Sequence, residues 1–445
     1  MSGAAPLPPG RTGLPFLGEV TTFLADGFAF VEERVRQYGL VFRTKILGRA
    51  TAVIVGPDAA GLFADEAKIQ RSGAMLPHVQ ALFGGHALPV LDGAEHRERK
   101  AFVMAAFTRE ALASYLPEMQ RQVNAALERW ASQPEVRWLD EFKRLALEVI
   151  CTTILGLPPG PTLDALARDY DIFGRGFSAL PVALPGTTYT KATQALARIL
   201  AVYEKNVQEH QSSPRGDGLG RILEARSARD GRAISVDDVK RELHHIVVAG
   251  LIVWGWFVTA VVELDRHPEV RDRLRAEVAT LPAGRLTPGA FAATPYLAQV
   301  ASEIRRLSPV VHVFFGKARE TFTFAGHQIP RGWMVLFGIR SSHLRPEIYA
   351  QPETFDPERF STARHEQDRH PHAFVPNGAG DAHTGHKCAG YEYAPLLLQV
   401  FLAELLRSGT TWSFTPGQDL SVDHATIPPS PRGGLRARVT RQGSR

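Results

Sequence analysis

Apolar positions recur at helical spacing through the middle of the chain. Over residues 93–264 an apolar residue returns every three or four positions, which predicts a series of helices. Stretches rich in Gly, Pro and Ser interrupt this pattern at residues 158–161, 174–185 and 213–220. We therefore expect a helical bundle with three exposed interruptions.

Outside the bundle the pattern predicts a few more helices and only short strands. Alternating β-branched residues at 41–44 and 52–55 flank Gly48 and predict a hairpin. Further strands are expected at 322–329 and 333–337, and further helices at 23–38, 295–307 and 394–406. The fold class is therefore mainly α with a minor β-sheet region. Because no linker, repeat or low-complexity tract divides residues 1–445, we expect a single domain.

One run of residues is apolar on every side. Residues 246–262 contain only apolar residues, Gly and Thr259, and charged or histidine residues flank them on both sides. At 17 residues the run is at the short edge of membrane-spanning length. A helix buried all round in a large protein has the same composition, and we prefer that interpretation to a membrane span.

Composition and charge narrow the classes of function. The 445 residues carry a formal net charge of +5, and the basic residues are scattered apart from an Arg-rich C-terminal end, so nucleic-acid binding is not expected. A basic face for an acidic electron carrier remains open. With only two cysteines, Cys151 and Cys388, and no signal-peptide pattern in residues 1–11, we expect a cytoplasmic protein.

The strongest chemical signal is Cys388 at the end of a Gly-rich loop, residues 374–390, before a predicted helix. Free N–H groups at a helix start favour a thiolate over a thiol. Gly390 leaves room for a flat cofactor, and His386 and Lys387 add positive charge that suits carboxylates of such a cofactor. A lone buried cysteine is the simpler alternative, and it is our interpretation of Cys151.

Two further elements precede the loop. Glu303 and Arg306 lie three residues apart and therefore on one helical face. Arg359, within residues 357–360, offers a second guanidinium to Glu303. We expect a structural cluster that holds the cysteine loop.

Together, and in this order, the Glu303/Arg306 pair, residues 357–360 and the 374–390 loop resemble the cytochrome P450 superfamily. The resemblance extends to Gly93-Ala-Glu-His96 with Lys100 one turn later, similar to a helix that contacts a haem propionate, and to residues 246–262 as the distal helix. It implies haem b between that helix and the loop, with Cys388 as the iron ligand. Residues implied to contact the haem are His96, Lys100, His386, Cys388, Gly390, and either Lys317 or Arg319.

The loop is longer than in most members of that superfamily, because Phe374 stands fourteen residues before Cys388. Such a loop, with Gly378 and Gly380, is similar to the fatty-acid peroxygenase branch. The segments Gln70-Arg71, Leu82-Phe-Gly84 and Asp92-Gly93 also resemble that branch.

The distal helix departs from two patterns of the superfamily. The peroxygenases have Arg-Pro where this chain has Val248 and Ala249, so a fatty-acid carboxylate held at that point is disfavoured. Oxygen-activating members have an acid and a Thr where this chain has Ile252 and Val253. Thr259 lies about 10 Å further along the helix axis and is expected to bond to its own backbone. The proton source stays open among a polar substrate group, ordered water and peroxide.

We expect oxidation of an apolar small molecule, such as a lipid, terpenoid or natural-product intermediate, with either ferredoxin and its reductase or hydrogen peroxide as partner. Alternatives are a rearrangement, dehydration or isomerisation without external oxygen, and a non-catalytic partner protein. A second metal site at His365, His370, His372 and His383 lacks supporting ligands. The expected catalytic face comprises Val248, Ala249, Gly250, Leu251, Ile252, Val253 and Trp254, with Phe314 and Phe315 beside it and residues 177–185 as a lid. A core aromatic is the simpler interpretation of Trp254.

Overall fold

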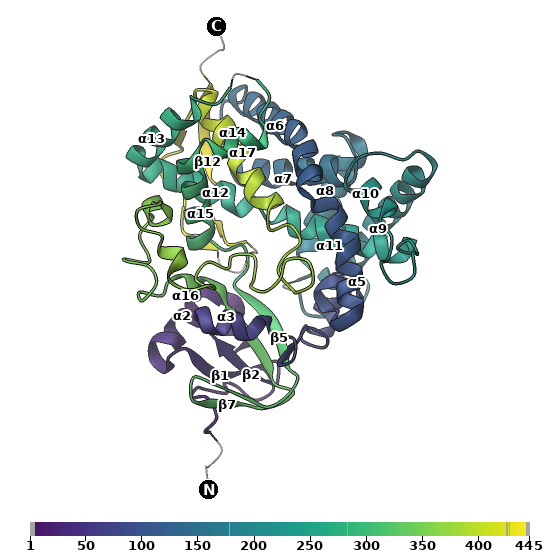
Figure 1. The fold of residues 1–445 in the computed structure, drawn as a ribbon, viewed down its shortest axis with the longest axis vertical. Helices are drawn as coiled ribbons and strands as arrows, with labels where there is room; N and C mark the ends of the chain where they lie inside the picture. The colour runs from purple at the N-terminus through teal and green to yellow at the C-terminus, as the bar shows by residue number, and fades with distance from the viewer. Residues whose placement is uncertain (1–4, 178, 283, 424–425, 427, 442–445) are drawn as a thin grey trace.

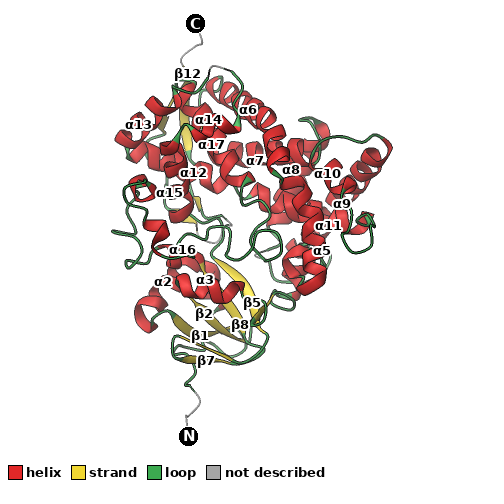
Figure 2. Ribbon diagram, in the orientation of Figure 1, coloured by secondary structure: helices red, strands yellow, loops and turns green. Residues whose placement is uncertain are grey.

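The computed structural model describes residues 5–441 except 178, 283, 424–425 and 427. It divides into a small sheet-containing part near the N-terminus and a larger helical part (Figure 1). Helices dominate and the strands are few, so the predicted fold class is confirmed (Figure 2).

Five strands form the main sheet in the order β1-β2-β8-β5-β3. β1 and β2 form the predicted hairpin, which turns at Leu47 and Gly48, both with positive φ. β8 joins β2 in parallel, whereas β5 pairs with β8 and β3 antiparallel. The bounds are β1 Val41–Ile46, β2 Arg49–Ile54, β3 Ile69–Gln70, β5 Val313–Ala318 and β8 Met334–Gly338.

The remaining strands are short and make three smaller sheets. β12 lies between β4 and β9 and places the C-terminal segment against the helical part. Their bounds are β4 Val136–Arg137, β6 Phe322–Phe324, β7 His327–Ile329, β9 Thr410–Phe414, β10 Val422–Asp423, β11 Ser430–Pro431 and β12 Arg436–Arg441.

The helices pack around one large hydrophobic core, in which the ring of Phe142 stacks on Trp138 and meets Trp130 edge to face. The helices are α1 Val20–Ala25, α2 Gly27–Tyr38, α3 Pro57–Ala64, α4 Pro77–Leu82, α5 Gly93–Met104, α6 Arg109–Ala131, α7 Trp138–Ile154, α8 Pro161–Gly174, α9 Thr188–Ser212, α10 Gly218–Glu224, α11 Val236–Leu251, α12 Trp254–Arg266, α13 Pro268–Val278, α14 Pro288–Ala292, α15 Pro295–Leu307, α16 Ile339–His343 and α17 Tyr393–Arg407.

Several predicted boundaries agree with the structure and two do not. The helix expected at 295–307 is α15, and the one expected at 394–406 is α17 with one more residue at each end. The helix expected over 23–38 is two helices, because Asp26 lies between them and caps α2 by accepting the N–H of Ala29 at 2.9 Å. The interruptions predicted within 93–264 all occur.

The run over 246–262 is not one continuous helix, which corrects the prediction. The N–H groups of Ile252 and Val253 both donate to the Gly250 carbonyl, so the carbonyls of Val248 and Ala249 lose their usual partners four residues later. The N–H of Gly255 likewise bonds to Ile252 at three-residue spacing. Gly and β-branched residues have low helix propensity, and four of them occur at the break: Gly250, Ile252, Val253 and Gly255. The helix α11 therefore ends before α12 begins.

By length and composition alone, residues 236–266 could cross a membrane. The most apolar window of this segment is 56% buried inside the structure, and α11 and α12 lie in the middle of the molecule against α7. Core helices of soluble proteins pass the same test, and the packing matches the predicted core helix.

Candidate haem-thiolate site

The loop at residues 374–390 is held in place by its own hydrogen bonds. The N–H of Cys388 donates to the Asn377 carbonyl at 2.9 Å. In the additional part of the loop, Asp381 Oδ1 accepts the N–H groups of His383 and Thr384 and the Thr384 hydroxyl. These bonds lower the pKa of Asp381 to about 2. Internal hydrogen bonds therefore hold the additional part of the loop in a compact turn.

Cys388 is surrounded by groups that favour a thiolate, although burial of its sulfur opposes one. Burial raises the pKa of the Cys388 thiol, whereas the Gly390 N–H, the Lys100 ammonium, the Asn377 side chain and the Arg305 guanidinium lower it. The side chain is nevertheless accessible on one face. A metal ion bound at that face would stabilise the thiolate against the effect of burial, because a thiol that coordinates a metal ion loses its proton.

The second cysteine offers a direct contrast. Cys151 is fully buried within the main core, and burial alone raises the pKa of its thiol. Among the described residues, no cation or N–H donor acts on it in the way that Lys100 acts on Cys388. The structure therefore agrees with the interpretation of Cys151 as a small buried hydrophobe.

The predicted Glu–Arg–Arg cluster is formed, and all three side chains are fully buried. Glu303 pairs with Arg306 at 2.6 Å and with Arg359 at 3.0 Å. Arg306 also donates to the carbonyls of His343 and Pro352, and Arg359 to that of Ala350. Glu366, also buried, pairs with Arg359 at 2.9 Å, so two carboxylates match the two guanidinium groups, which is the condition under which buried ions are tolerated.

The cluster is connected to the cysteine loop through His343. Its Nδ1 lies 3.2 Å from the Arg306 carbonyl, and its Nε2 accepts the N–H of Val375 at 3.0 Å. Burial lowers the pKa of His343 to about 3, so the ring is neutral and Nε2 is an acceptor. The Tyr349 hydroxyl adds a bond to the Ala373 carbonyl at 3.1 Å. These bonds fix the start of the loop.

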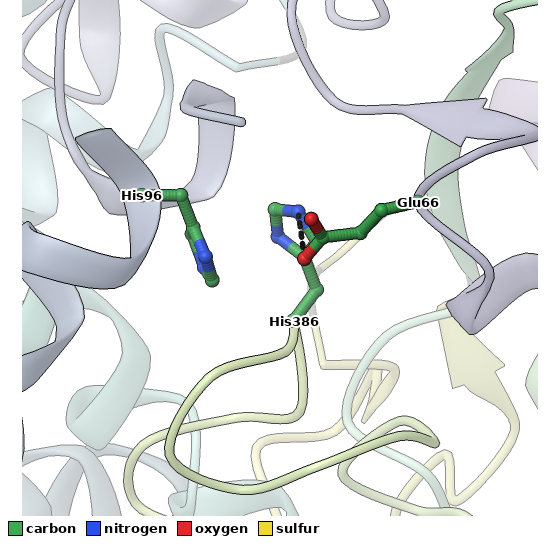
Figure 3. A group of neighbouring side chains, drawn as sticks. All are labelled: Glu66, His96 and His386. Atoms are coloured by element: carbon green, nitrogen blue, oxygen red, sulfur yellow. Dashed lines mark ion pairs between the residues drawn. The ribbon is translucent and has the colours of Figure 1, made fainter. Parts of the chain in front are cut away.

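A group of polar side chains lies beside the loop, where a haem edge is expected. The rings of His96, from α5, and His386, from the loop, are 3.9 Å apart, and Glu66 lies opposite His386 (Figure 3). Asp92 Oδ1 is 3.6 Å from His386 Nε2. Within the described residues, ligand atoms of Glu66, His96 and His386 are close enough to hold a metal ion.

This group fits the carboxylates of a haem better than a metal ion. Three of its buried nitrogen atoms have no hydrogen-bond partner among the described residues: Arg71 Nη1, His96 Nδ1 and His386 Nε2. Burial lowers the pKa of Arg71 to about 10, and burial together with the charges of His386 and Lys100 lowers that of His96 to about 3. Buried donors and cations of this kind are stabilised by an added anion. The donor set therefore suits haem propionates.

Other residues expected near the haem have different placements. The ammonium of Lys100 donates to the backbone carbonyls of Gly385 and Lys387, so it holds the loop. Arg319 donates to the Glu66 carbonyl at 3.0 Å and is 3.8 Å from Asp92, on the outer side of the group. Lys317 lies half-buried on β5 opposite Gln70. A Cβ on Gly390 would meet only the Cys388 sulfur, at 4.0 Å, so space is kept at the thiol.

The distal helix presents only part of its predicted face. Val248, Ala249, Leu251 and Ile252 are half-buried in a helix that is otherwise mostly buried, and Val248 and Leu251 also pack against the main core. Gly250 and Trp254 do not share that side. A Cβ on Gly250 would meet Ile150 of α7 at 2.7 Å, while Trp254 and Val253 are buried in the main core.

The placement of Trp254 corrects its expected place on the catalytic face, because the Lys143 ammonium of α7 lies 5.4 Å from the centre of its ring. Thr259 bonds to the Gly255 carbonyl at 3.1 Å, as predicted.

The neighbouring aromatic residues divide between two locations. Phe314 stacks on Phe63 with ring centres 6.4 Å apart and lies against Gly378 of the cysteine loop. Phe315 packs in the separate cluster of β1, β2 and β8. At the expected lid, Phe177 packs against Phe83. Leu180 and Leu184 beyond it are largely exposed, and residue 178 lies outside the described residues.

Four residues of the site had no assigned role in the sequence. Arg71 was noticed only within a resemblance, while His343, Asn377 and Arg305 carry no spacing that marks them. Arg305 Nη2 donates to Asn377 Oδ1 at 2.6 Å, and the Arg305 charge lowers the pKa of the Cys388 thiol. The only sequence signal for Arg305 is its position next to Arg306.

Comparisons with known proteins agree with this geometry. Residues 8–424 match the family model described as Cytochrome P450. The chain is 32% identical to cytochrome P450 120 of Synechocystis sp. over 98% of this chain and 97% of that protein. The retinoic acid-bound structure of cyanobacterial CYP120A1 is similar with a TM-score of 0.90 and 31% identity, over 99% and 100% of the two chains. A variant of cytochrome P450 OleT in complex with arachidonic acid gives 0.83 and 25%, over the whole of both chains.

Proposed function

This chain belongs to the cytochrome P450 family of haem-thiolate oxidoreductases, and from that premise we propose that it oxidises an apolar carboxylic acid or a related lipid-like molecule. The two ligands named with the similar structures, retinoic acid and arachidonic acid, are both long and apolar with one carboxylate. The observation that most directly supports this proposal is the half-buried aliphatic face formed by Val248, Ala249, Leu251 and Ile252. Apolar walls of this kind bind apolar ligands by burial.

The proposed division of labour follows from the site. Residues 1–445 form a single domain in this proposal. Cys388 would hold haem b, which supplies oxidising chemistry when bound. Arg71, His96 and His386 would hold its propionates, and the Glu303 cluster keeps the cysteine loop in position. The aliphatic side chains orient the substrate and exclude bulk water, so that the bond nearest the thiolate-ligated metal reacts.

The proposed oxidant is hydrogen peroxide, or oxygen with assistance from a polar group of the substrate. Support comes from Ile252 and Val253, which are aliphatic where oxygen-activating relatives carry an acid and a hydroxyl. Ferredoxin and its reductase remain the partners of the alternative route, and a cytoplasmic location fits both.

The test is turnover of a panel of lipids and terpenoids, with and without a carboxylate, by the purified haem protein. One arm supplies hydrogen peroxide and the other supplies ferredoxin, reductase and NADPH. Product with peroxide alone supports the proposed oxidant, whereas product only with the electron supply overturns it and leaves a monooxygenase. Product in neither arm, with a pre-oxidised substrate rearranged instead, overturns the proposed oxidation.

A further inference from the structure

One polar pair interrupts the aliphatic wall of the distal helix. His245 precedes Ala249 by four residues, which places the two side chains one turn apart on the same face of α11. Glu242, one turn earlier, is fully buried. We propose that His245, oriented by Glu242, holds and donates the proton on the distal side of the site. The inference rests on the proposed oxidation and adds the proton source that Ile252 and Val253 do not provide.

The carboxylate of Glu242 is fixed from three directions. Its Oε1 accepts the N–H of Leu88 at 2.9 Å and the Arg99 guanidinium at 3.1 Å. Its Oε2 lies 3.3 Å from Nδ1 of His245. A carboxylate held by a loop and by α5 in this way cannot turn to follow the ring. Glu242 is therefore a positioning residue, and the imidazole takes its orientation from the carboxylate.

The neighbours of α11 show which way His245 points. The α7 side is occupied by Gly250, beside Ile150, and by the buried Val247. His244 points elsewhere, because its Nε2 lies 2.8 Å from the Leu82 carbonyl and its Nδ1 3.3 Å from the Tyr170 hydroxyl.

The side that remains carries His245 together with Val248, Ala249 and Ile252, and all four are partly accessible. The imidazole thus lies in the wall that we assign to the substrate.

The hydrogen bond to Glu242 determines what the ring can do. With Nδ1–H directed at the carboxylate, Nε2 is left to gain and lose a proton. Nε2 forms no hydrogen bond to the described residues, and the side chain is 18% exposed, so water can return the proton. His245 lies about 6 Å along the helix axis from Ala249.

The charges around the ring support a proton carrier. Glu242 and His244 lie on the same helix, and Arg99 approaches from α5. Arg99 also pairs with Asp238 at 2.7 Å, so its charge is shared between two carboxylates. The exposed ring of His86 pairs with Glu95 instead. The Glu242 carboxylate therefore contacts Nδ1 of His245 directly, while the charge of the nearby guanidinium is divided between two carboxylates.

The proposed step balances with a peroxide as oxidant. The O–O bond breaks heterolytically, the leaving oxygen takes the proton from Nε2 and departs as water or an alcohol, and the other oxygen enters the substrate. The proton released from the O–H group of the peroxide passes through water back to Nε2, so the cycle consumes no net proton. Without the acid the same bond breaks by homolysis, since the leaving oxygen cannot depart as an anion in an apolar site.

The test uses His245→Gln in the holoenzyme, because glutamine can keep a hydrogen bond to Glu242 but cannot carry a proton. Thr259→Val is the matched control in the same apolar segment. The first readout is the infrared C–O stretch of carbon monoxide on the reduced haem at roughly pH 5 to 8. We expect a pH-dependent frequency in the wild type and in Thr259→Val, and a constant frequency in His245→Gln. The same pH dependence in all three proteins overturns the proposal.

The second readout is the product of cumyl hydroperoxide, which gives 2-phenylpropan-2-ol by heterolysis and acetophenone by homolysis. His245→Gln should shift the product towards acetophenone and lower kcat by about 100-fold, the scale of general acid catalysis, with KM nearly unchanged. A raised KM with unchanged kcat would make His245 a binding residue and overturn the proton role. If the wild type oxidises no panel substrate, the proposed function fails, while the infrared comparison still decides the role of His245.

Discussion

The two sides of the site differ in how much of their geometry depends on charge. On the cysteine side, Glu303, Arg306 and Arg359 are fully buried and matched, and His343 carries their position to the loop. On the distal side, the side chains of Val248, Ala249 and Ile252 are aliphatic, and the pair of His245 and Glu242 is what interrupts them. The side that holds the cofactor thus depends on a few interlocked ions, whereas the side assigned to the substrate depends on shape.

The energetic costs of change differ accordingly. Removing one partner of a buried ion cluster costs about 3–5 kcal/mol, because an unmatched charge is left inside. Exchanging one aliphatic residue for another of similar volume costs less than about 1.5 kcal/mol. The cysteine side therefore tolerates little change, and the distal side can be altered to suit a substrate.

The largest expected effect is on the cysteine side, at the iron ligand. Cys388→Ser should abolish the red-shifted absorption of a thiolate-ligated ferrous carbon monoxide complex and all peroxide-driven turnover, because the thiolate donor is lost. Absorption spectra of the reduced protein measure this. Cys151→Ala is the matched cysteine control and should keep the spectrum. An unchanged spectrum in Cys388→Ser would assign the ligand to another residue.

The next effect concerns the ion cluster. Glu303→Gln should lower the free energy of unfolding by about 3–5 kcal/mol, since Arg306 and Arg359 lose their shared carboxylate. Denaturant unfolding with haem absorbance as a second probe measures it. Arg273→Gln, which breaks the exposed pair with Glu358, should cost no more than about 1 kcal/mol. Equal losses in the two variants would contradict the buried-charge argument.

The smallest of these effects concerns the propionate group. Arg71→Gln should weaken haem binding by about 1.5–3 kcal/mol, the scale of a hydrogen bond to a charged group, which is roughly 10- to 150-fold in affinity. Haem transfer to an acceptor protein measures the loss. Arg319→Gln, at the exposed edge of the same group, should have a smaller effect. The reverse order would place a propionate at the outer edge.

The same contrast explains what could be predicted from the sequence. The Glu303–Arg306 pair, Arg359 and Cys388 carry fixed spacings, because each must meet a particular charge or metal, and the predicted cluster is formed. His343 and Arg71 escaped prediction since His343 contacts Val375, 32 residues away, and the Arg71 main chain contacts Asp92, 21 residues away. The break at Ile252 and the placement of Trp254 were missed because hydrophobic periodicity records burial but not hydrogen-bond spacing or direction.

The break between α11 and α12 determines how the distal wall can bind water. The carbonyls of Val248 and Ala249, left without their helical partners, are acceptors that belong to the main chain. No side-chain substitution along this face removes them. The side chains of this wall can therefore change while two main-chain acceptors remain, to which water would bind.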